Sequence, residues 1–208
     1  WNSIKMSTVA VVGNIIFGVA AAYAMARLNF KGKTLMDTLI MIPWALPGTV
    51  VAVNLIAAFS EPTVFSFNQV LIGTFWILPL AYFVRQLPLV FRSTFASLMQ
   101  MDKSVEEAAR SLGANWWYSF RKIVLPITMS GVLAGTLLAF VQGLGEFVAS
   151  ILIYNVSTMP MSVAIFQKLY AFQFGTACAY GVLQVLLIVI VLLITQKLEG
   201  SMASNNMM

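Results

Sequence analysis

Five long apolar runs restrict this chain to a helical membrane architecture. Each is long enough for a helix to cross the hydrocarbon core of a bilayer, and none alternates apolar and polar residues as a barrel strand does. The runs are Ser7–Ala26, Leu35–Phe59, Gln69–Val90, Ile127–Ile153 and Cys178–Thr195. Only 9% of the 208 residues are charged, against about 25% in an average soluble domain. We therefore predict an all-α, polytopic membrane helix bundle with about five transmembrane helices in one domain, residues 1–199, followed by a disordered tail, residues 200–208.

Lysine and arginine are concentrated on one side of these runs. Ten of the twelve basic residues flank that side: Arg27, Lys31, Lys33, Arg85, Arg92, Lys103, Arg110, Arg121, Lys122 and Lys197. The other two are Lys5 and Lys168. Cytoplasmic loops of membrane proteins carry the excess of Lys and Arg, so Arg27–Lys33 and Asp102–Lys122 are predicted to be cytoplasmic. Five spans then put the N-terminal end outside, and we expect a further helix before Trp1.

The residue types that the chain lacks narrow its chemistry. It has no histidine and a single cysteine, Cys178, which excludes His-ligated metal sites, Ser-His hydrolysis and an intrachain disulfide. It also has no Walker-type phosphate loop. The net charge of +5 is spread between apolar segments instead of forming a basic block, so no nucleic-acid partner is expected. We predict a membrane protein that is not an enzyme and binds no metal, with Cys178 as a small packing residue.

The segment between the third and fourth runs has the pattern of a short amphipathic helix that ends in a glycine turn. Ser104 and Glu107 have the spacing of a capping box at the helix start. Apolar residues then recur at the spacing of one helical face: Val105, Ala108, Ala109 and Leu112. Gly113 suits a left-handed C-terminal turn. A second short helix is expected to follow, with Trp116, Phe120 and Ile123 on one side, before Pro126 starts the next span.

The apolar stripe of this short helix needs a partner, which is either lipid or protein. Helices that lie on a lipid surface usually present bulky residues such as Leu or Phe. Ala108, Ala109 and Gly113 are small and would let another surface approach closely. The pattern therefore favours protein docking over an interfacial helix.

This loop resembles the EAA loop of ABC importer permeases. The family signature is Glu-Ala-Ala, three residues, Gly, nine residues and Ile-x-Leu-Pro. Every fixed position is present at that spacing: Glu107, Ala108, Ala109, Gly113, Ile123, Leu125 and Pro126. The stretch from Arg92 to Phe147 is also similar to these permeases. The resemblance implies a type I ABC importer transmembrane domain with a cytoplasmic coupling helix that inserts into a cleft on a separate ATPase subunit.

The same resemblance implies roles and partners. The residues expected to contact the ATPase are Glu107, Ala108, Ala109 and Gly113, and those expected to fix the loop against the next span are Ile123, Leu125 and Pro126. ATP with Mg²⁺ would bind to a partner ATPase dimer, and this chain itself would bind no cofactor. A second permease module and an extracytoplasmic substrate-binding protein would complete the importer, in the plasma membrane of a bacterium or archaeon.

Polar residues inside the predicted spans are candidates for the translocation path, because such groups are costly in lipid and usually face a cavity. They are Asn54, Gln142 and Glu146. For Glu146 the alternatives are a structural hydrogen bond between helices and an interfacial position. Pro43 and Pro47 in the second run indicate either plain kinking or a bend beside the path.

The outer segment Tyr154–Gly175 is rich in aromatic residues. It either meets the substrate-binding protein or lies in an aromatic belt at the membrane surface. Residues Met159–Gly181 resemble the last module of permeases for ferric iron, thiamine, polyamines and phosphonates. Ferric iron or another small polar solute is therefore the expected cargo.

Two other classes of membrane protein fit the sequence less well. An ion-coupled transporter or channel would carry charged residues deep in several spans, and Glu146 is the one such candidate. An intramembrane enzyme would need a paired nucleophile and base, which the histidine-free composition does not supply.

Overall fold

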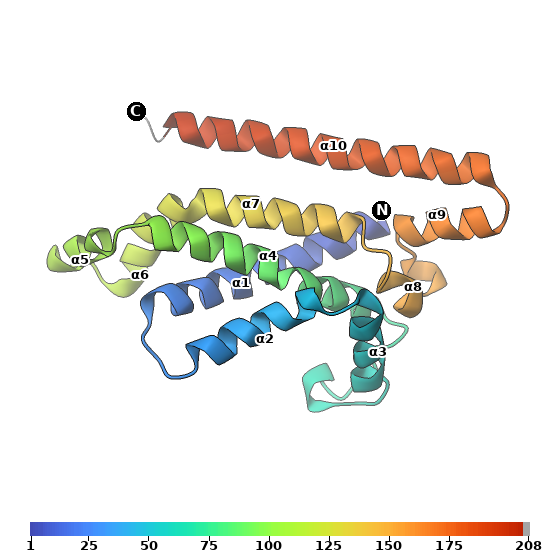
Figure 1. The fold of residues 1–208 in the computed structure, drawn as a ribbon, viewed down its shortest axis with the longest axis horizontal. Coiled ribbons are helices and arrows are strands. Elements are labelled where there is room, and N and C mark those ends of the chain that lie inside the picture. The colour runs from blue at the N-terminus through green and yellow to red at the C-terminus, as the bar shows by residue number, and fades with distance from the viewer. Residues whose placement is uncertain (206–208) are drawn as a thin grey trace.

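The computed structural model describes the backbone of residues 1–205, without the side chains of Phe65, Gln196 and residues 198–205. Within that range the fold consists of helices and turns without strands (Figure 1). The α-helices are α1 (Asn2–Arg27), α2 (Lys33–Ala45), α3 (Gly48–Phe59), α4 (Ile77–Gln100), α5 (Lys103–Ser111), α6 (Trp116–Ser119), α7 (Leu125–Leu144), α8 (Ser150–Ile153), α9 (Met161–Tyr170) and α10 (Phe174–Asn205). Short 3-10 turns lie at Val64–Ser66 and Val156–Thr158, and a π turn lies at Phe120–Val124. The predicted all-α architecture is confirmed.

Three long helices, α1, α4 and α7, pack side by side and form the centre of the bundle (Figure 1). Small residues let α7 approach α4 closely. The Ser93 hydroxyl of α4 donates to the Gly131 carbonyl of α7 at 2.7 Å. A Cβ on Gly135 would lie 2.8 Å from the Leu89 carbonyl oxygen. Such small residues are what allows two membrane helices to pack backbone against backbone.

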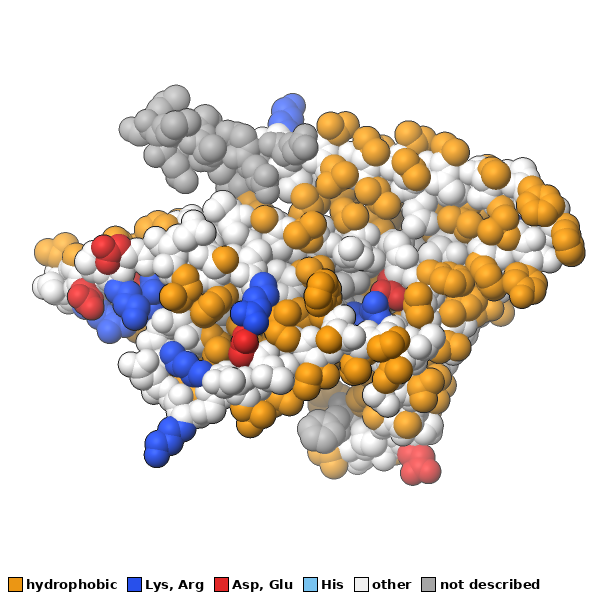
Figure 2. Space-filling model, viewed as in Figure 1, with side chains coloured by type: hydrophobic (Ala, Val, Ile, Leu, Met, Phe, Trp, Pro, Cys, Tyr) orange, Lys and Arg blue, Asp and Glu red, His pale blue; other side chains and the backbone are white. Residues whose placement is uncertain are grey.

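Central α4 buries large side chains on the faces that meet its neighbours. Tyr82 and Phe91 are fully buried there, and Met6 and Ala22 of α1 pack in the same clusters. Helices α5 and α6 lie at one end of the bundle, and α8, α9 and the N-terminus lie at the other (Figure 1). Charged side chains gather at the α5 end, while hydrophobic side chains cover much of α10 (Figure 2).

Three helical stretches are long and apolar enough to cross a membrane: Asn2–Arg27, Trp116–Leu144 and Phe174–Thr195. The bent pair α2 and α3 counts as a fourth span if it is taken as one. Helix α4 is not among them although it has 24 residues. It carries Arg85, Gln86 and Arg92 and is surrounded by α1, α2, α3 and α7. Its neighbours are therefore largely protein, which explains why it is less apolar than the other spans.

The second and third predicted spans differ from the observed helices. Leu35–Phe59 forms two helices, α2 and α3, that meet at an angle of 108°. Pro47 is the cause, because it cannot donate a backbone hydrogen bond and it forces Leu46 into an extended conformation. The third span begins at Ile77 instead of Gln69, and it continues to Gln100.

The last two predicted spans also have different limits. The fourth is interrupted at Gly145, after which α8 begins at Ser150. The outer segment after it contains α9. Helix α10 continues as far as Asn205, into the tail that the sequence predicts to be disordered from Gly200. Residues 206–208 lie outside the described part of the chain.

The single cysteine, predicted to be a small packing residue, is not buried by the described part of the chain. Cys178 is exposed on α10. Only 6% of the apolar window within Phe174–Thr195 is buried against the rest of the chain, so most side chains of this part of α10 face outward.

Candidate functional site

Helix α5 is the short amphipathic helix predicted between the third and fourth runs, but its N-terminal cap differs from the prediction. The cap is Asp102, whose carboxylate accepts the backbone N–H of Ser104 at 2.9 Å. Because Asp102 is the N-cap and the helix begins at Lys103, Ser104 lies within the first turn and is not the cap, so Ser104 and Glu107 do not form a capping box. The hydrogen bonds from Ser104 lower the pKa of the Asp102 carboxyl.

The predicted glycine turn at the end of α5 is confirmed. Gly113 has a φ of +85°, in the left-handed region that favours glycine. The Gly113 N–H donates to the Arg110 carbonyl at 2.9 Å, and the Ala114 N–H donates to the Ala109 carbonyl at 3.0 Å. This pair of bonds is a Schellman motif, which fixes the direction in which the chain leaves the helix.

One face of α5 is open and lines a shallow groove of about 680 Å³. Its lining includes Val105, Ala108, Ala109, Leu112, Gly113, Tyr118 and Ile123. Leu112 is 90% exposed. A largely apolar groove on a helix and its turn, left uncovered by the described residues, is a candidate surface for another molecule.

Glu106 lies on the opposite face of α5 and is buried against the bundle. The predicted stripe stays on one face, because Val105, Ala108, Ala109 and Leu112 all line the groove, with Ala109 the most buried of the four. The Glu106 carboxylate pairs with the Arg27 guanidinium, and these side chains are only 7% and 8% exposed. Sequence reasoning missed Glu106; two acidic residues in succession on an amphipathic helix, with Arg27 ending the first span, were the available signal.

The segment after α5 differs in detail from the predicted second helix and restart. Asn115 caps α6 by accepting the Tyr118 N–H at 2.8 Å. Helix α6 then passes through the π turn into α7, and Pro126 lies in the first turn of α7, where the sequence predicts a helix start. Pro126 has no N–H to donate, and the wider π turn just before it accommodates that missing bond. Trp116 and Phe120 stack at 5.6 Å, whereas Ile123 faces the groove.

Glu146 forms a second ion pair inside the bundle. Its Oε2 lies 3.1 Å from Arg85 Nε of α4. Its Oε1 accepts the Ala149 N–H at 3.0 Å. These contacts match the structural alternative given for Glu146. Arg85, predicted to lie near the end of the third span, lies inside α4, which continues to Gln100.

The other two candidates for the translocation path, Asn54 and Gln142, are both exposed on this chain. Within residues 1–205 no hydrogen bond joins either of them to Glu146, so the structure does not assemble the three into one site. Among the described residues, no three His, Cys, Asp or Glu side chains lie close enough to hold a metal ion.

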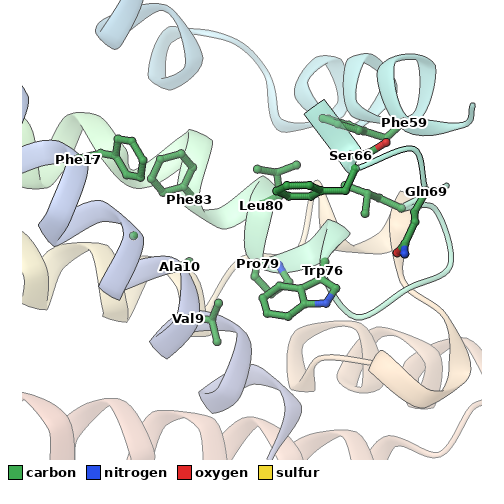
Figure 3. A pocket seen from close by; sticks show the side chains of 13 residues that line it. Val9, Ala10, Phe17, Phe59, Ser66, Gln69, Trp76, Pro79, Leu80 and Phe83 are labelled. Atoms are coloured by element: carbon green, nitrogen blue, oxygen red, sulfur yellow. The ribbon is translucent and has the colours of Figure 1, made fainter. Parts of the chain in front are cut away.

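A separate cavity of about 650 Å³ lies between α1, the start of α4 and the turn that follows α3 (Figure 3). Aromatic side chains dominate its lining, among them Phe17, Phe59, Trp76 and Phe83, with Ser66 and Gln69 as polar members. None of the described lining residues is ionisable. The cavity therefore offers no charged group to a polar cargo, and α5 remains the better candidate for function.

Sequence comparison decides the family. A family described as binding-protein-dependent transport system inner membrane component matches residues 14–204. This chain belongs to that family. The predicted binding-protein-dependent ABC importer permease is therefore confirmed.

Relatives carry the names of three different cargoes. The chain is 36% identical to the molybdenum transport system permease protein ModB of Escherichia coli K12 over 155 residues, 72% of this chain and 68% of ModB. It is 35% identical to the sulfate transport system permease protein CysT of the same strain over 179 residues, 82% of this chain and 65% of CysT. It is 27% identical to the ferric transport system permease protein FbpB of Actinobacillus pleuropneumoniae over 199 residues, 96% of this chain but only 28% of FbpB.

A solved structure confirms the predicted type I importer fold. An inward-facing structure of the MetNI methionine ABC transporter contains a chain that matches with a TM-score of 0.79. The match covers 97% of this chain and 93% of that one, at 18% sequence identity. At this identity the likeness concerns the fold alone.

Proposed function

We propose that this chain forms one transmembrane half of an ABC importer, and that the open face of α5 docks a separate ATPase subunit. The observation that carries the proposal is the division of α5 into two faces. Glu106 holds one face in the bundle through Arg27, while the stripe Val105, Ala108, Ala109 and Leu112 lines the groove on the other face. A helix held in this way can transmit a movement of the ATPase to the membrane helices.

In the proposed importer, the partners are an ATPase dimer carrying ATP and Mg²⁺, a second permease module and an extracytoplasmic substrate-binding protein. Glu107, next to the buried Glu106, is exposed and free to contact the ATPase. The open face of α10 and the exposed Asn54 and Gln142 are then surfaces for the second module or the translocation path between the two modules.

Two glycines with the same backbone geometry allow a controlled test of docking. Gly113 ends α5 with a φ of +85°, and Gly32 lies in the turn between α1 and α2 with a φ of +98°. Neither has a neighbouring atom within 4 Å of an added Cβ. Aspartate at either position therefore adds the same charge and a similar backbone strain, on the order of 1 kcal/mol. Only Gly113 lies on the groove.

The measurement is capture of the ATPase by the purified permease carrying Gly113→Asp or Gly32→Asp. We expect Gly113→Asp to insert into the membrane but to lose ATPase capture and transport, and Gly32→Asp to retain both. Equal ATPase capture by the two variants, at the level of the unaltered permease, would show that α5 is not the docking site.

For the cargo, we propose a small inorganic ion, with the oxyanions sulfate and molybdate ranked ahead of ferric iron. The support is the higher identity to relatives named for molybdenum and sulfate transport, 36% and 35%, than to the relative named for ferric transport, 27%. This reverses the order expected from Met159–Gly181 alone. Uptake of radiolabelled sulfate, molybdate and ferric iron in a deletion strain tests the ranking. Loss of ferric iron uptake with normal uptake of both oxyanions would restore iron to first place.

A further inference from the structure

We propose that the Arg27–Glu106 ion pair is the joint through which the docking helix α5 moves the first membrane helix, α1. The inference rests on the proposed docking of an ATPase to α5 and adds the route that the movement takes inside the permease. It makes Arg27 and Glu106 positioning residues for transport, on the face of α5 turned away from the ATPase.

The chain connectivity shows why such a joint is needed. Helix α5 follows α4 after Met101 and Asp102, and it leads through Gly113 to α6 and α7. A displacement of α5 therefore pulls on α4 and α7 through the backbone. Helix α1 has no such connection, because Arg27 and Glu106 are 79 residues apart in sequence. A direct path from α5 to α1, in addition to the packing of α1 against α4 and α7, therefore runs through side-chain contacts.

The contacts between α1 and α5 are polar, buried and mutually bonded. Arg27 Nε donates to Glu106 Oε1, and the Tyr23 hydroxyl, one turn earlier on α1, donates to Glu106 Oε2 at 3.3 Å. Both carboxylate oxygens of Glu106 are thus held by the last turn of α1. Arg27 also donates from Nη2 to the Met101 carbonyl at 3.2 Å, which ties the end of α4 into the same cluster.

An aromatic cluster extends the joint to the segment after α5. Trp116 Nε1 donates to the Tyr23 hydroxyl at 3.0 Å. The Tyr23 ring packs edge-on against Trp116 at 6.0 Å and against Phe120 at 5.2 Å. The last turn of α1 therefore contacts the end of α4, the buried face of α5 and the start of α6.

A buried ion pair suits a mechanical joint better than an apolar contact. Apolar side chains slide over one another with little change in energy, because their attraction is not directional. A charge in a poorly solvated place is strongly penalised when its partner moves away. The pair therefore resists both separation and sliding, and α1 follows α5 in either direction.

Adjacent glutamates provide a matched experiment. Glu106 is buried against α1, and Glu107 is exposed. Glu106→Gln and Glu107→Gln make the same chemical change on neighbouring positions of one helix. The complete transporter, with its ATPase and substrate-binding protein, is reconstituted in vesicles. ATPase capture, ATP hydrolysis and cargo transported per ATP are measured for each variant.

For Glu106→Gln we expect normal ATPase capture and continued hydrolysis, with transport per ATP reduced by about 5-fold to 150-fold, the usual range for coupling between two sites. For Glu107→Gln we expect weaker ATPase capture, with hydrolysis and transport falling together and transport per ATP unchanged. A merely structural role for Glu106 would reduce the amount of assembled transporter without changing that ratio.

A cleavable cross-link tests the same joint without relying on one substitution. In a Cys178→Ser background, Arg27→Cys and Glu106→Cys are joined by a short bis-methanethiosulfonate reagent. We expect transport per ATP to be low before cross-linking, to rise when the reagent joins α1 to α5 and to fall again on reduction. A ratio that stays at the wild-type value in Glu106→Gln, or that does not respond to the cross-link, would overturn the proposal. Loss of the docking assignment itself would appear separately, as normal ATPase capture by Gly113→Asp.

Discussion

The permease contains two buried Arg–Glu pairs that are bonded in different ways. In the pair at the α5 end, both carboxylate oxygens of Glu106 accept hydrogen bonds, and Arg27 bonds to both Glu106 and the Met101 carbonyl. In the pair inside the bundle, Glu146 is also fully bonded, but Arg85 Nη1 is buried without a hydrogen-bond partner within the described chain. The Arg85 side chain is 23% exposed, against 8% for Arg27.

The two pairs therefore differ in whether every buried hydrogen-bond donor has a partner. The Arg27–Glu106 pair joins α5 to α1 with no spare buried donor, which suits a contact that must stay intact during movement. The Arg85–Glu146 pair joins α4 to the turn after α7 and lies beside Gly48, at the break between α2 and α3. A buried polar group without a partner is destabilising by about 1–3 kcal/mol, so the interior cluster should rearrange more easily.

Replacing the arginine of either pair should give the largest change in the free energy of unfolding, and the size of the change should differ between the two pairs. Arg27→Leu leaves the buried Glu106 charge unpaired, and we expect a loss of about 3–5 kcal/mol in the free energy of unfolding. Arg85→Leu also removes the unpartnered Nη1, so we expect a smaller loss, about 1–3 kcal/mol. Denaturation of the purified subunit in mixed micelles measures both losses. A larger loss of stability for Arg85→Leu than for Arg27→Leu would contradict the view that Arg27–Glu106 is the more completely bonded pair.

Replacing both members of a pair should sharpen the distinction between stability and coupling. With leucine at both positions no charge is left buried, and the free energy of unfolding should return to within about 1 kcal/mol of the wild type. We expect this for Arg27→Leu with Glu106→Leu and for Arg85→Leu with Glu146→Leu. Only the first double variant should lose transport per ATP through failed movement of α1. Wild-type coupling in that variant would mean that apolar packing serves equally well.

Alanine in place of Gly48, which contacts Arg85, should change the stability less than the arginine substitutions do. A Cβ at position 48 would collide with the Arg85 guanidinium, so alanine there must displace the arginine. Gly175, at the start of α10, has nothing within 4 Å of an added Cβ. Alanine in a helix is favoured over glycine by about 1 kcal/mol. We expect Gly175→Ala to gain part of this stability and Gly48→Ala to gain none, as measured by thermal unfolding.

The smallest expected effect is the pH dependence of the stability that the Asp102 cap gives to α5. The folded pKa of Asp102 lies below its ordinary value of 3.8 because the carboxylate accepts hydrogen bonds from Ser104. The stabilisation is therefore fully present above pH 3.8 and is lost as the pH falls through the lower, folded pKa. The α5 amides should exchange their hydrogens faster as the pH falls through this range. Asp102→Asn, which caps the helix without titrating, should remove the pH dependence. Loss of protection above pH 5 would point to another group.

The sequence was enough to predict the all-helical membrane fold and the glycine turn that ends α5, because apolar run length and the positive φ at Gly113 have direct sequence signals. The break at Pro47 was visible as a proline, but the bend depends on which neighbours replace the lost hydrogen bond. The cap was misplaced by two residues because Asp102 and Ser104 both suit a helix start. The roles of Glu106 and Arg85 could not be predicted, since their partners lie 79 and 61 residues away in sequence and are brought together only by packing.

Cross-linking of α5 to the ATPase subunit tests the central claim most directly. In a Cys178→Ser chain, a cysteine replaces either Ala108, which is exposed on the groove, or Lys31, which is exposed in the turn between α1 and α2 and does not line the groove. A thiol-directed photo-cross-linker is attached in membranes that contain the ATPase. We expect a cross-linked permease–ATPase product from Ala108→Cys and almost none from Lys31→Cys. No product from Ala108→Cys, or equal amounts from both positions, would contradict docking of the ATPase on the open face of α5.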